Sequence, residues 1–389
     1  MIKILTEDFE IYKSKSDIEL FKKYFLSRYS QLRKILIEKL RDMNKTTITI
    51  SNISENITEY TIIARIFEIT ENKTTIFFKL DDPSGVIDLR YFKNPNQTNL
   101  ILITDIVLAF TIKNNVISQI IFPDVPSKHT SKFKKRKEPI YAVLISDVHV
   151  GSKNFISDKF NKFIDSINEI ENLKYLIIGG DTVDGVGVYP GQEYDLELLN
   201  IDDQYKQLAQ FLTKLKPQLE IIIAPGNHDY LPIEEPQKPL NARFTKYFEK
   251  RVTFIANPCL FEIENVTYLL YHGRGADSLL AAGKFTLKEA QQMMKYLIKI
   301  RHLSPMYDSK NTNFILEKDC LVIDRVPDVF QTGHIHKKFI LPYKGILVCN
   351  SGCWQEQTEF QKRMDIDPDK TSFVLLDLNN LELSHIRTL

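Results

Sequence analysis

Five apolar, strand-like runs in the second half of the chain each end in residues that can bind a metal ion or carry a proton. The segments that follow these runs are Asp147-Val148-His149 after "YAVLIS", Asp181 after "YLIIGG", Asn227-His228-Asp229 after "IIIAPG", His272-Gly273 after "YLLY" and His334-Ile335-His336 after "VFQTG". In open α/β sheets the carboxyl ends of the strands share one edge, where binding sites are built. We therefore expect loops at one such edge to bring all five segments together.

Two of these segments place their polar residues two positions apart. In an extended chain such residues point to the same side, so Asp147 with His149, and His334 with His336, are each expected to reach into one pocket. Each motif alone has an ordinary explanation as turn chemistry, and a single histidine such as His272 before glycine is more often structural. Their joint occurrence favours a site, because five of the eight histidines fall inside these short motifs.

Together the motifs supply seven nitrogen and oxygen ligands, which are too many for one ion. The candidate ligands are Asp147, His149, Asp181, Asn227, His272, His334 and His336. This set suits two divalent ions that share a bridging carboxylate, and mixed imidazole and carboxylate ligands without thiolate favour Mn, Fe or Zn over Mg or Ca. Paired ions about 3.5–4 Å apart hydrolyse phosphate esters, because they generate hydroxide, hold the phosphate and stabilise the leaving oxygen. The remaining histidines, His129, His302 and His385, are assigned to the surface or to packing.

The N-terminal part of the chain, residues 1–126, shows a different sequence pattern. Residues 1–45 are expected to form a helical segment, with an amphipathic helix from about Ser16 to Asp42 that starts at a capping box of Ser16 and Glu19. Short runs rich in Ile, Phe, Thr and Val then predict a small closed β-barrel such as an OB-fold over residues 46–126. Its segment "DDPSG" is expected to be a hairpin connection.

The rest of the chain divides into a linker and a second domain. The dense basic run at residues 127–139 is expected to be a solvated linker. From residue 140 to residue 389, buried-type strands alternate with helical stretches, which predicts an α/β layered domain.

Three of these segments keep a second interpretation. The helical stripe packs against the protein or docks a partner, and its residues are Ile18, Phe21, Phe25, Leu32 and Leu36. The barrel binds single-stranded nucleic acid or serves as a protein-contact module. The basic run is a plain linker or lies near a phosphate backbone.

Composition limits the class of protein. The formal net charge is only +1, so affinity for nucleic acid must come from local patches. No apolar stretch approaches the ~18 residues of a membrane span, and the acidic start "MIKILTEDFE" is unlike a signal peptide. The four cysteines form no CxxC pair, which argues against a zinc finger and a disulfide framework. We expect a cytoplasmic protein with no membrane partner.

The motifs D-x-H, GD, GNHD, H-G and GH-x-H resemble those of the calcineurin-like metallophosphoesterase superfamily, which includes Mre11-type nucleases. This resemblance covers the chain from about Ile140 onward and implies an αββα sandwich. The longer stretches "LISDVHVGSKNF", "GGDTVDGVGVYPGQE" and "APGNHD", together with the preceding barrel, resemble the small subunit of archaeal family D DNA polymerases. With this second family, the resemblance covers most of the chain from about Thr46 onward.

The resemblance also implies roles for individual residues. One metal ion would be held by Asp147, His149, Asp181 and His336, and the other by Asp181, Asn227, His272 and His334, so that Asp181 bridges them. His228 would sit beside the scissile phosphate, where it stabilises charge or protonates the leaving 3′-oxygen. Asp229 would orient His228, since a catalytic imidazole needs a defined tautomer. Asp184 is expected to be a turn residue.

In that family the polymerase active site lies in a separate large subunit. The resemblance therefore implies a 3′→5′ proofreading exonuclease whose partners are the large catalytic subunit, the single-stranded 3′ primer end of DNA and, through the holoenzyme, a sliding clamp. Two alternatives stay open. A stand-alone Mre11-like nuclease or phosphoesterase is disfavoured by a barrel that precedes the catalytic domain. A non-catalytic scaffold is disfavoured by His228, because a structural metal site needs no histidine that is not a ligand.

Overall fold

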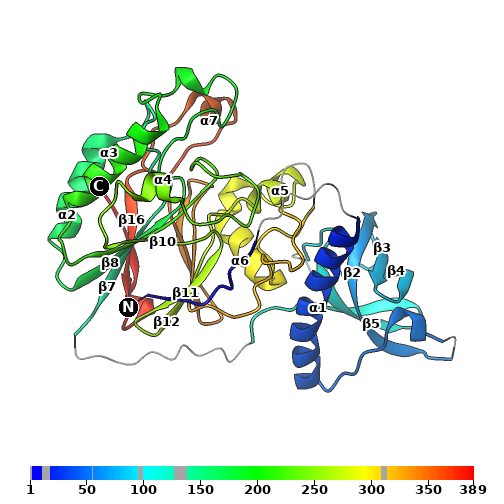
Figure 1. Cartoon of the computed structure of the whole chain (residues 1–389). Coiled ribbons are helices and arrows are strands. Elements are labelled where there is room, and N and C mark those ends of the chain that lie inside the picture. Colours follow the sequence, from blue (N-terminus) through cyan, green and yellow to red (C-terminus); the bar gives the residue numbers. More distant parts are fainter. Residues whose placement is uncertain (1, 11–17, 55, 95–99, 127–137, 308–312) are drawn as a thin grey trace.

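The C-terminal part of the chain is built on two six-stranded β-sheets (Figure 1). The computed structural model describes residues 2–10, 18–54, 56–94, 100–126, 138–307 and 313–389. The first sheet has the order β10 (Val252–Phe254), β9 (Glu220–Ala224), β8 (Leu173–Gly179), β7 (Tyr141–Ile145), β16 (Ser372–Asp377) and β17 (His385–Thr388). The second has the order β1 (Lys3–Ile4), β11 (Cys259–Ile263), β12 (Val266–Leu270), β13 (Val329–Thr332), β15 (Ile346–Ser351) and β14 (Lys338–Tyr343).

The strands that precede the candidate site residues belong to both sheets. β7, β8 and β9 are parallel neighbours in the first sheet, and β12 and β13 are parallel neighbours in the second. The expectation of one shared sheet edge is therefore corrected. The carboxyl ends of two parallel sets meet instead, because the two sheets are packed face to face.

Helices cover the outer face of each sheet. Ala142 and Leu144 of β7 lie in the apolar cluster between the sheets, whereas Val143 and Ile145 pack with the helices on the other side, as the period of two along a strand requires. The covering helices are α2 (Ser157–Asn168) and α3 (Ile201–Thr213) on the first sheet, and α5 (Ala276–Ala281) and α6 (Ala290–Ile300) on the second. Two short helices, α4 (Ala242–Thr245) and α7 (Glu359–Arg363), lie in the connections. The predicted α/β class and the αββα layering are confirmed.

The N-terminal β-rich region folds into a closed five-stranded barrel. Its strands are β2 (Glu59–Glu71), β3 (Thr75–Asp82), β4 (Gly85–Phe92), β5 (Val107–Lys113) and β6 (Val116–Ile121), in the order β2-β3-β4-β6-β5. All neighbours are antiparallel except β4 and β6. The predicted hairpin at "DDPSG" joins β3 to β4, where Asp82 Oδ1 accepts hydrogen bonds from the backbone N–H groups of Ser84 and Gly85 at 2.7 and 3.1 Å.

The segment before the barrel is only partly helical. α1 (Ile18–Asp42) packs on the barrel through Leu32, Leu36 and Leu40. Its buried residues recur every four positions, at Leu20, Tyr24, Arg28, Leu32, Leu36 and Leu40. Ile18 and Phe21, predicted to share the packed face, are 72% and 40% exposed. The predicted cap at Ser16 lies outside the described residues, as does most of the basic run at 127–139. Residues 3 and 4, expected in a helical segment, instead pair with β11 as β1.

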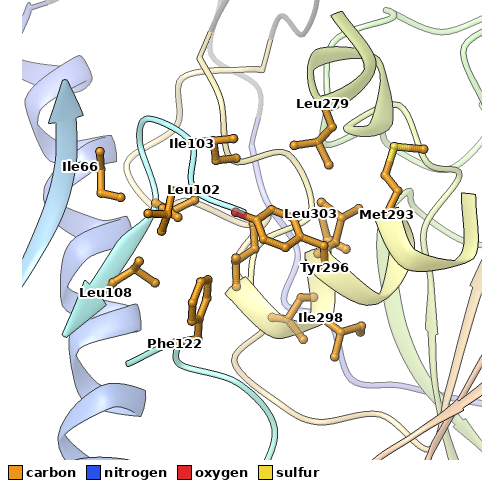
Figure 2. Close-up of a cluster of buried hydrophobic side chains, with 14 of the residues drawn as sticks. Ile66, Leu102, Ile103, Leu108, Phe122, Leu279, Met293, Tyr296, Ile298 and Leu303 are labelled. Carbon is orange, nitrogen blue, oxygen red and sulfur yellow. The ribbon is translucent and has the colours of Figure 1, made fainter. Parts of the chain in front are cut away.

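The barrel and the sandwich share one hydrophobic cluster (Figure 2). On the barrel side its labelled members are Ile66, Leu102, Ile103, Leu108 and Phe122, and on the sandwich side they are Leu279, Met293, Tyr296, Ile298 and Leu303. The Tyr296 hydroxyl also donates to the Ile101 carbonyl at 3.2 Å. The barrel is therefore packed firmly against α5 and α6. Within the described ranges, no helix has the length and apolar composition needed to cross a bilayer.

A buried ion pair adds a polar link between α1 and the sandwich. Arg28 Nε donates to Asp319 Oδ2 at 2.6 Å, and His302 Nε2 lies 2.9 Å from the same oxygen. All three side chains are almost fully buried. His302, assigned from the sequence to surface or packing, therefore has a packing role.

Candidate metal centre

Four of the five strand ends bring six of the seven predicted ligands together in two groups. Asp147, His149 and His336 each offer one ligand atom within 4.8 Å of the others. Asp181, His272 and His334 form a second group that meets the same limit. These six side chains come from the ends of β7, β8, β12 and β13, and all are buried except His334, which is partly buried.

Asp181 lies between the two groups. Its Oδ2 atom is 3.3 Å from His272 Nε2 in one group and 3.8 Å from His149 Nε2 in the other. Its Oδ1 atom accepts a hydrogen bond from the His228 backbone N–H at 2.8 Å. This placement is what a bridging carboxylate requires, although the bridging role itself stays a prediction.

The polar atoms at the centre of the site fit a bound cation. The His272 Nδ1 atom lies 2.9 Å from the Gly179 carbonyl, which can only accept, so Nδ1 carries the hydrogen and Nε2 keeps its lone pair. That lone pair and the Asp181 carboxylate face each other, an arrangement that needs a positive charge between them. Burial lowers the pKa of His272, but the Asp181 carboxylate raises it to about 10, so when no ion is bound the positive charge is a proton on Nε2.

Asn227 also indicates that a cation fits at the site. Its buried Oδ1 atom and His272 Nε2 are among the few described side-chain atoms with no hydrogen-bond partner. Buried polar atoms are almost always paired, so these two unpaired atoms, each on a predicted ligand, indicate a place for a metal ion. The ligand atoms are nitrogen and oxygen only, which suits Mn, Fe or Zn.

The site backbone differs from the extended geometry expected for D-x-H and H-x-H. Asp147 and His149 both have φ of 54°, Asp181 has 48°, and His334 and His336 have 67° and 51°. These values are left-handed, which is uncommon for residues other than glycine and is typical of functional sites. The expected geometry was wrong because each strand ends before its ligand, and the chain turns so that the side chains face the centre.

Gly226 shows how tightly the backbone approaches the site. A Cβ atom at this position would lie 2.2 Å from Asp181 Oδ1 and 2.7 Å from His272 Cε1. Only glycine fits, because any side chain there would displace both candidate ligands.

His228 is held by a different residue from the one predicted. Its Nδ1 atom lies 2.8 Å from the Asp184 carbonyl, so Nδ1 carries the hydrogen and Nε2 is the free nitrogen. The ring lies edge-on to His149, with centroids 4.7 Å apart. The His228 side chain is 19% exposed, more than those of His149 or His272, which leaves it accessible to a substrate.

The expected orientation of His228 by the Asp229 side chain is not found among the described hydrogen bonds. Asp229 instead accepts from the Gly226 N–H at 2.8 Å, the Thr182 backbone and hydroxyl, and the Tyr205 hydroxyl. Burial and the nearby Asp181 raise the pKa of Asp229 to about 6. Asp229 therefore ties the loop after β9 to the loop after β8, because its side chain turns away from the His228 ring.

Three polar residues that contact the site were missed or misjudged from the sequence. Asp184, expected to be a turn residue, is buried, and its Oδ1 atom lies 2.9 Å from His149 Nδ1. Asp277, in the first turn of α5, lies 2.9 Å from His334 Nε2. Gln361 in α7 has its Nε2 atom 3.1 Å from His336 Nδ1. Only Asp184 carried a local signal, since it lies three residues after Asp181 in a glycine-rich turn.

Comparison with known proteins gives both a family and close relatives. The family model for the B subunit of DNA polymerases alpha and epsilon matches residues 142–341. A solved structure described as a novel archaeal phosphodiesterase aligns with 64% of this chain and all of its own, at 15% identity and a TM-score of 0.33, which makes it a distant likeness.

The curated relatives cover almost the whole chain. A protein of Thermoplasma acidophilum is 34% identical over 95% of this chain and 79% of its own length. One of Archaeoglobus fulgidus is 33% identical over 90% of this chain and 74% of its own, and one of Methanocaldococcus jannaschii is 38% identical over 90% and 62%. All three are described as DNA polymerase II small subunit. The chain therefore belongs to the family of DNA polymerase II small subunits, which confirms the resemblance inferred from its motifs.

Proposed function

We propose that this chain is the 3′→5′ exonuclease subunit of a heterodimeric replicative DNA polymerase of family D. One observation carries the proposal. Two groups of imidazole and carboxylate ligands meet at Asp181, beside His228, a histidine that belongs to neither predicted ligand set. Such a pair of groups suits hydrolysis of a phosphodiester by two metal ions.

Each of the two groups of ligand residues would hold one metal ion. Asp147, His149 and His336 would hold one ion, and Asn227, His272 and His334 the other, with Asp181 shared. When bound, the ions supply an activated water and neutralise the charge of the phosphate. Mn²⁺ is our first choice, with Fe and Zn as alternatives, because the ligand set lacks thiolate.

The chain itself fixes which nitrogen each histidine presents. Asp184 holds Nδ1 of His149, the Gly179 carbonyl holds Nδ1 of His272, and Asp277 holds Nε2 of His334. Such outer partners fix the tautomer and orientation of ligand histidines.

His228 is the residue best placed to act on the substrate directly. Its Nδ1 hydrogen points to the Asp184 carbonyl, so Nε2 remains for the phosphate or the leaving 3′-oxygen. There it would stabilise negative charge or deliver a proton. Asp229 supports this role indirectly, by holding the loop that carries His228.

Several finer assignments belong to the same proposal. The strand order of the barrel, with a parallel β4–β6 pair closing it, supports an OB-fold over residues 46–126. Residues 140–389 would form the metallophosphoesterase domain, joined through 127–139. The partners would be the large catalytic subunit, the single-stranded 3′ primer end of DNA and, through the holoenzyme, a sliding clamp, all in the cytoplasm.

The experiment is Mn²⁺-dependent digestion of a primer–template with a mismatched 3′ end by the full chain. We expect stepwise shortening from the 3′ end that is abolished in His334→Ala and His228→Ala, while the exposed Phe92→Ala control digests normally. If the chain cuts nothing with Mn²⁺, alone or with its large subunit, the scaffold alternative holds. Internal cuts without 3′ polarity would support a stand-alone nuclease.

A further inference from the structure

Three exposed aromatic side chains lie in segments that are linked to one side of the site. Tyr194, Tyr230 and Phe360 are 77%, 48% and 64% exposed. Tyr230 follows His228 by two residues, and Phe360 precedes Gln361, whose amide contacts His336. Tyr194 lies in a segment bonded to Lys153, four residues after His149. Because His149 is grouped with His336 and separately with His228, the three segments converge on the same half of the centre.

Tyr194 is fixed beside the segment that follows His149. The Lys153 N–H donates to the Asp195 carbonyl at 2.9 Å, and the Lys153 ammonium donates to the Tyr194 carbonyl at 2.8 Å. Ser152 and Leu196 form a β-bridge next to these contacts. The Tyr194 segment is thus held against the residues three and four positions after His149, with the positive charge of Lys153 beside its backbone.

Phe360 is fixed to the same segment from the other side. Gln355 Nε2 donates to Ser152 Oγ at 2.8 Å, and the Glu356 N–H donates to the Asn154 carbonyl at 2.8 Å. Four residues later α7 carries Phe360 next to Gln361, whose amide contacts His336. The Phe360 and Tyr194 segments are therefore both bonded to residues 152–154, and Figure 1 shows α7 beside the loops of this end of the sandwich.

Tyr230 follows His228 by two residues. Its N–H donates to the Tyr205 hydroxyl at 3.0 Å, which keeps this stretch close to the site. The guanidinium carbon of Arg243, which also pairs with Asp202, lies 5.5 Å from the centre of the Tyr230 ring. The ring thus has a cationic neighbour while about half of it stays exposed.

We propose that Tyr194, Tyr230 and Phe360 form a stacking surface that binds the nucleobases of an unpaired DNA strand next to the metal centre. This inference rests on the proposed function and names its substrate class, an unpaired 3′ end. Aromatic rings stack on any base, and Lys153 supplies charge for the backbone. A paired base is already stacked in its duplex and must first be released from it, so the surface selects frayed or mismatched ends.

The test measures binding without turnover. We would use the full chain with Mn²⁺ in a His228→Ala background and compare, by fluorescence anisotropy, a short oligothymidylate with an abasic strand of equal length. The parent protein is expected to bind oligothymidylate more tightly. Tyr194→Ala, Tyr230→Ala and Phe360→Ala should each weaken that binding by about fivefold or more and leave the abasic strand unaffected. Tyr194→Phe should keep wild-type binding, because it keeps the ring.

Three results would overturn the proposal. One is a parent protein that binds both strands equally, and another is an equal loss in Phe92→Ala, an exposed ring on the barrel strand β4. The third is that the three variants bind DNA normally but no longer assemble with the large subunit, which would make the surface a protein interface. Failure of the proposed function is separable, because it would appear as no Mn²⁺-dependent hydrolysis of bis(4-nitrophenyl) phosphate by the wild type, while the anisotropy still tests stacking.

Discussion

Replacing Asp184 with alanine should weaken metal binding, although Asp184 belongs to neither predicted ligand set. Its side chain is 3% exposed, and Oδ1 lies 2.9 Å from His149 Nδ1 and 3.2 Å from Gln355 Nε2. Because a carboxylate accepts here, Nδ1 carries the hydrogen and His149 Nε2 presents its lone pair to the centre. Without Asp184 the ring can take the other tautomer, in which Nε2 is protonated and cannot bind a metal.

Asp184→Ala should change both the affinity for metal and the folding stability. Loss of an outer partner of a ligand histidine lowers metal affinity by about 10–100-fold, or ~1.4–2.7 kcal/mol. The same change leaves the buried Nδ1–H of His149 without its acceptor and removes one of the two acceptors of Gln355 Nε2, which should cost about 1–3 kcal/mol of folding stability. Asp184→Asn keeps an acceptor oxygen, so we expect it to retain more of both quantities. The Asp184 carbonyl that holds His228 is unchanged in either variant.

Calorimetric titration of the full chain with Mn²⁺ measures the first effect, and urea unfolding in a chelator measures the second. Asp195→Ala is a matched control, because it removes a carboxylate from the same loop. The Asp195 carboxylate contacts the Tyr189 hydroxyl and no histidine among the described hydrogen bonds. Equal Mn²⁺ affinity in Asp184→Ala and the wild type would refute the view that this carboxylate selects the His149 tautomer. An equal loss in Asp195→Ala would assign the effect to the loop.

Three further outcomes follow from contacts in the structure. Asp277→Ala should lower Mn²⁺ affinity by about 10–100-fold through His334, with Asp277→Asn less affected in the same titration. Gly226→Ala should abolish Mn²⁺ binding without removing a ligand, since its Cβ would lie 2.2 Å from Asp181 Oδ1; unchanged binding in a folded variant would contradict the geometry. Arg28→Met should lower the free energy of unfolding by about 3–5 kcal/mol, because it leaves the buried Asp319 without its permanently charged partner and with His302 alone beside it. Burial would raise the pKa of Asp319, but His302 and Arg28 hold it well below its usual 3.8. The stability that this carboxylate gives the wild type should therefore be present above about pH 4 and be lost as the pH falls. Urea unfolding measured at several pH values should show a smaller loss of stability in acid for Asp319→Asn.

The sequence predicted the features that depend on local signals. Buried apolar runs followed by glycine turns predicted which residues would lie at strand ends, and that placed Asp147, Asp181 and His272 near one another. Short β-branched and aromatic runs likewise predicted the barrel. These patterns work because a strand and the turn after it are determined largely by neighbouring residues.

The partners of those residues could not be predicted in the same way. Asp277 reaches His334 only because α5 packs beside β13, and nothing in the spacing of the two residues indicates it. The family resemblance implied that Asp229 orients the His228 ring, but the Asp229 side chain bonds to Thr182 instead. β1 pairs with a strand more than 250 residues away, a contact that depends on the finished sheet.

The strained backbone of the site leads to a last prediction, on metal removal. Five candidate ligand residues have φ between 48° and 67°, and a residue other than glycine in this region costs about 1–3 kcal/mol. Two carboxylates, Asp147 and Asp181, are also buried together at 0% and 2% exposure. This arrangement opposes folding unless something that binds only the folded chain offsets it.

Divalent ions would provide that offset, so their removal should lower the temperature of unfolding. A ligand that binds only the native state stabilises it by about 2.7 kcal/mol at a hundred times its Kd. We expect wild-type protein in Mn²⁺ to unfold at a higher temperature than in EDTA, and His334→Ala to show a smaller difference. If the wild type unfolds identically in both, with Mn²⁺ far above any physiological level, the strain is offset by packing alone. The two groups around Asp181 would then be a polar core rather than a metal centre, and the exonuclease proposal would lose its support.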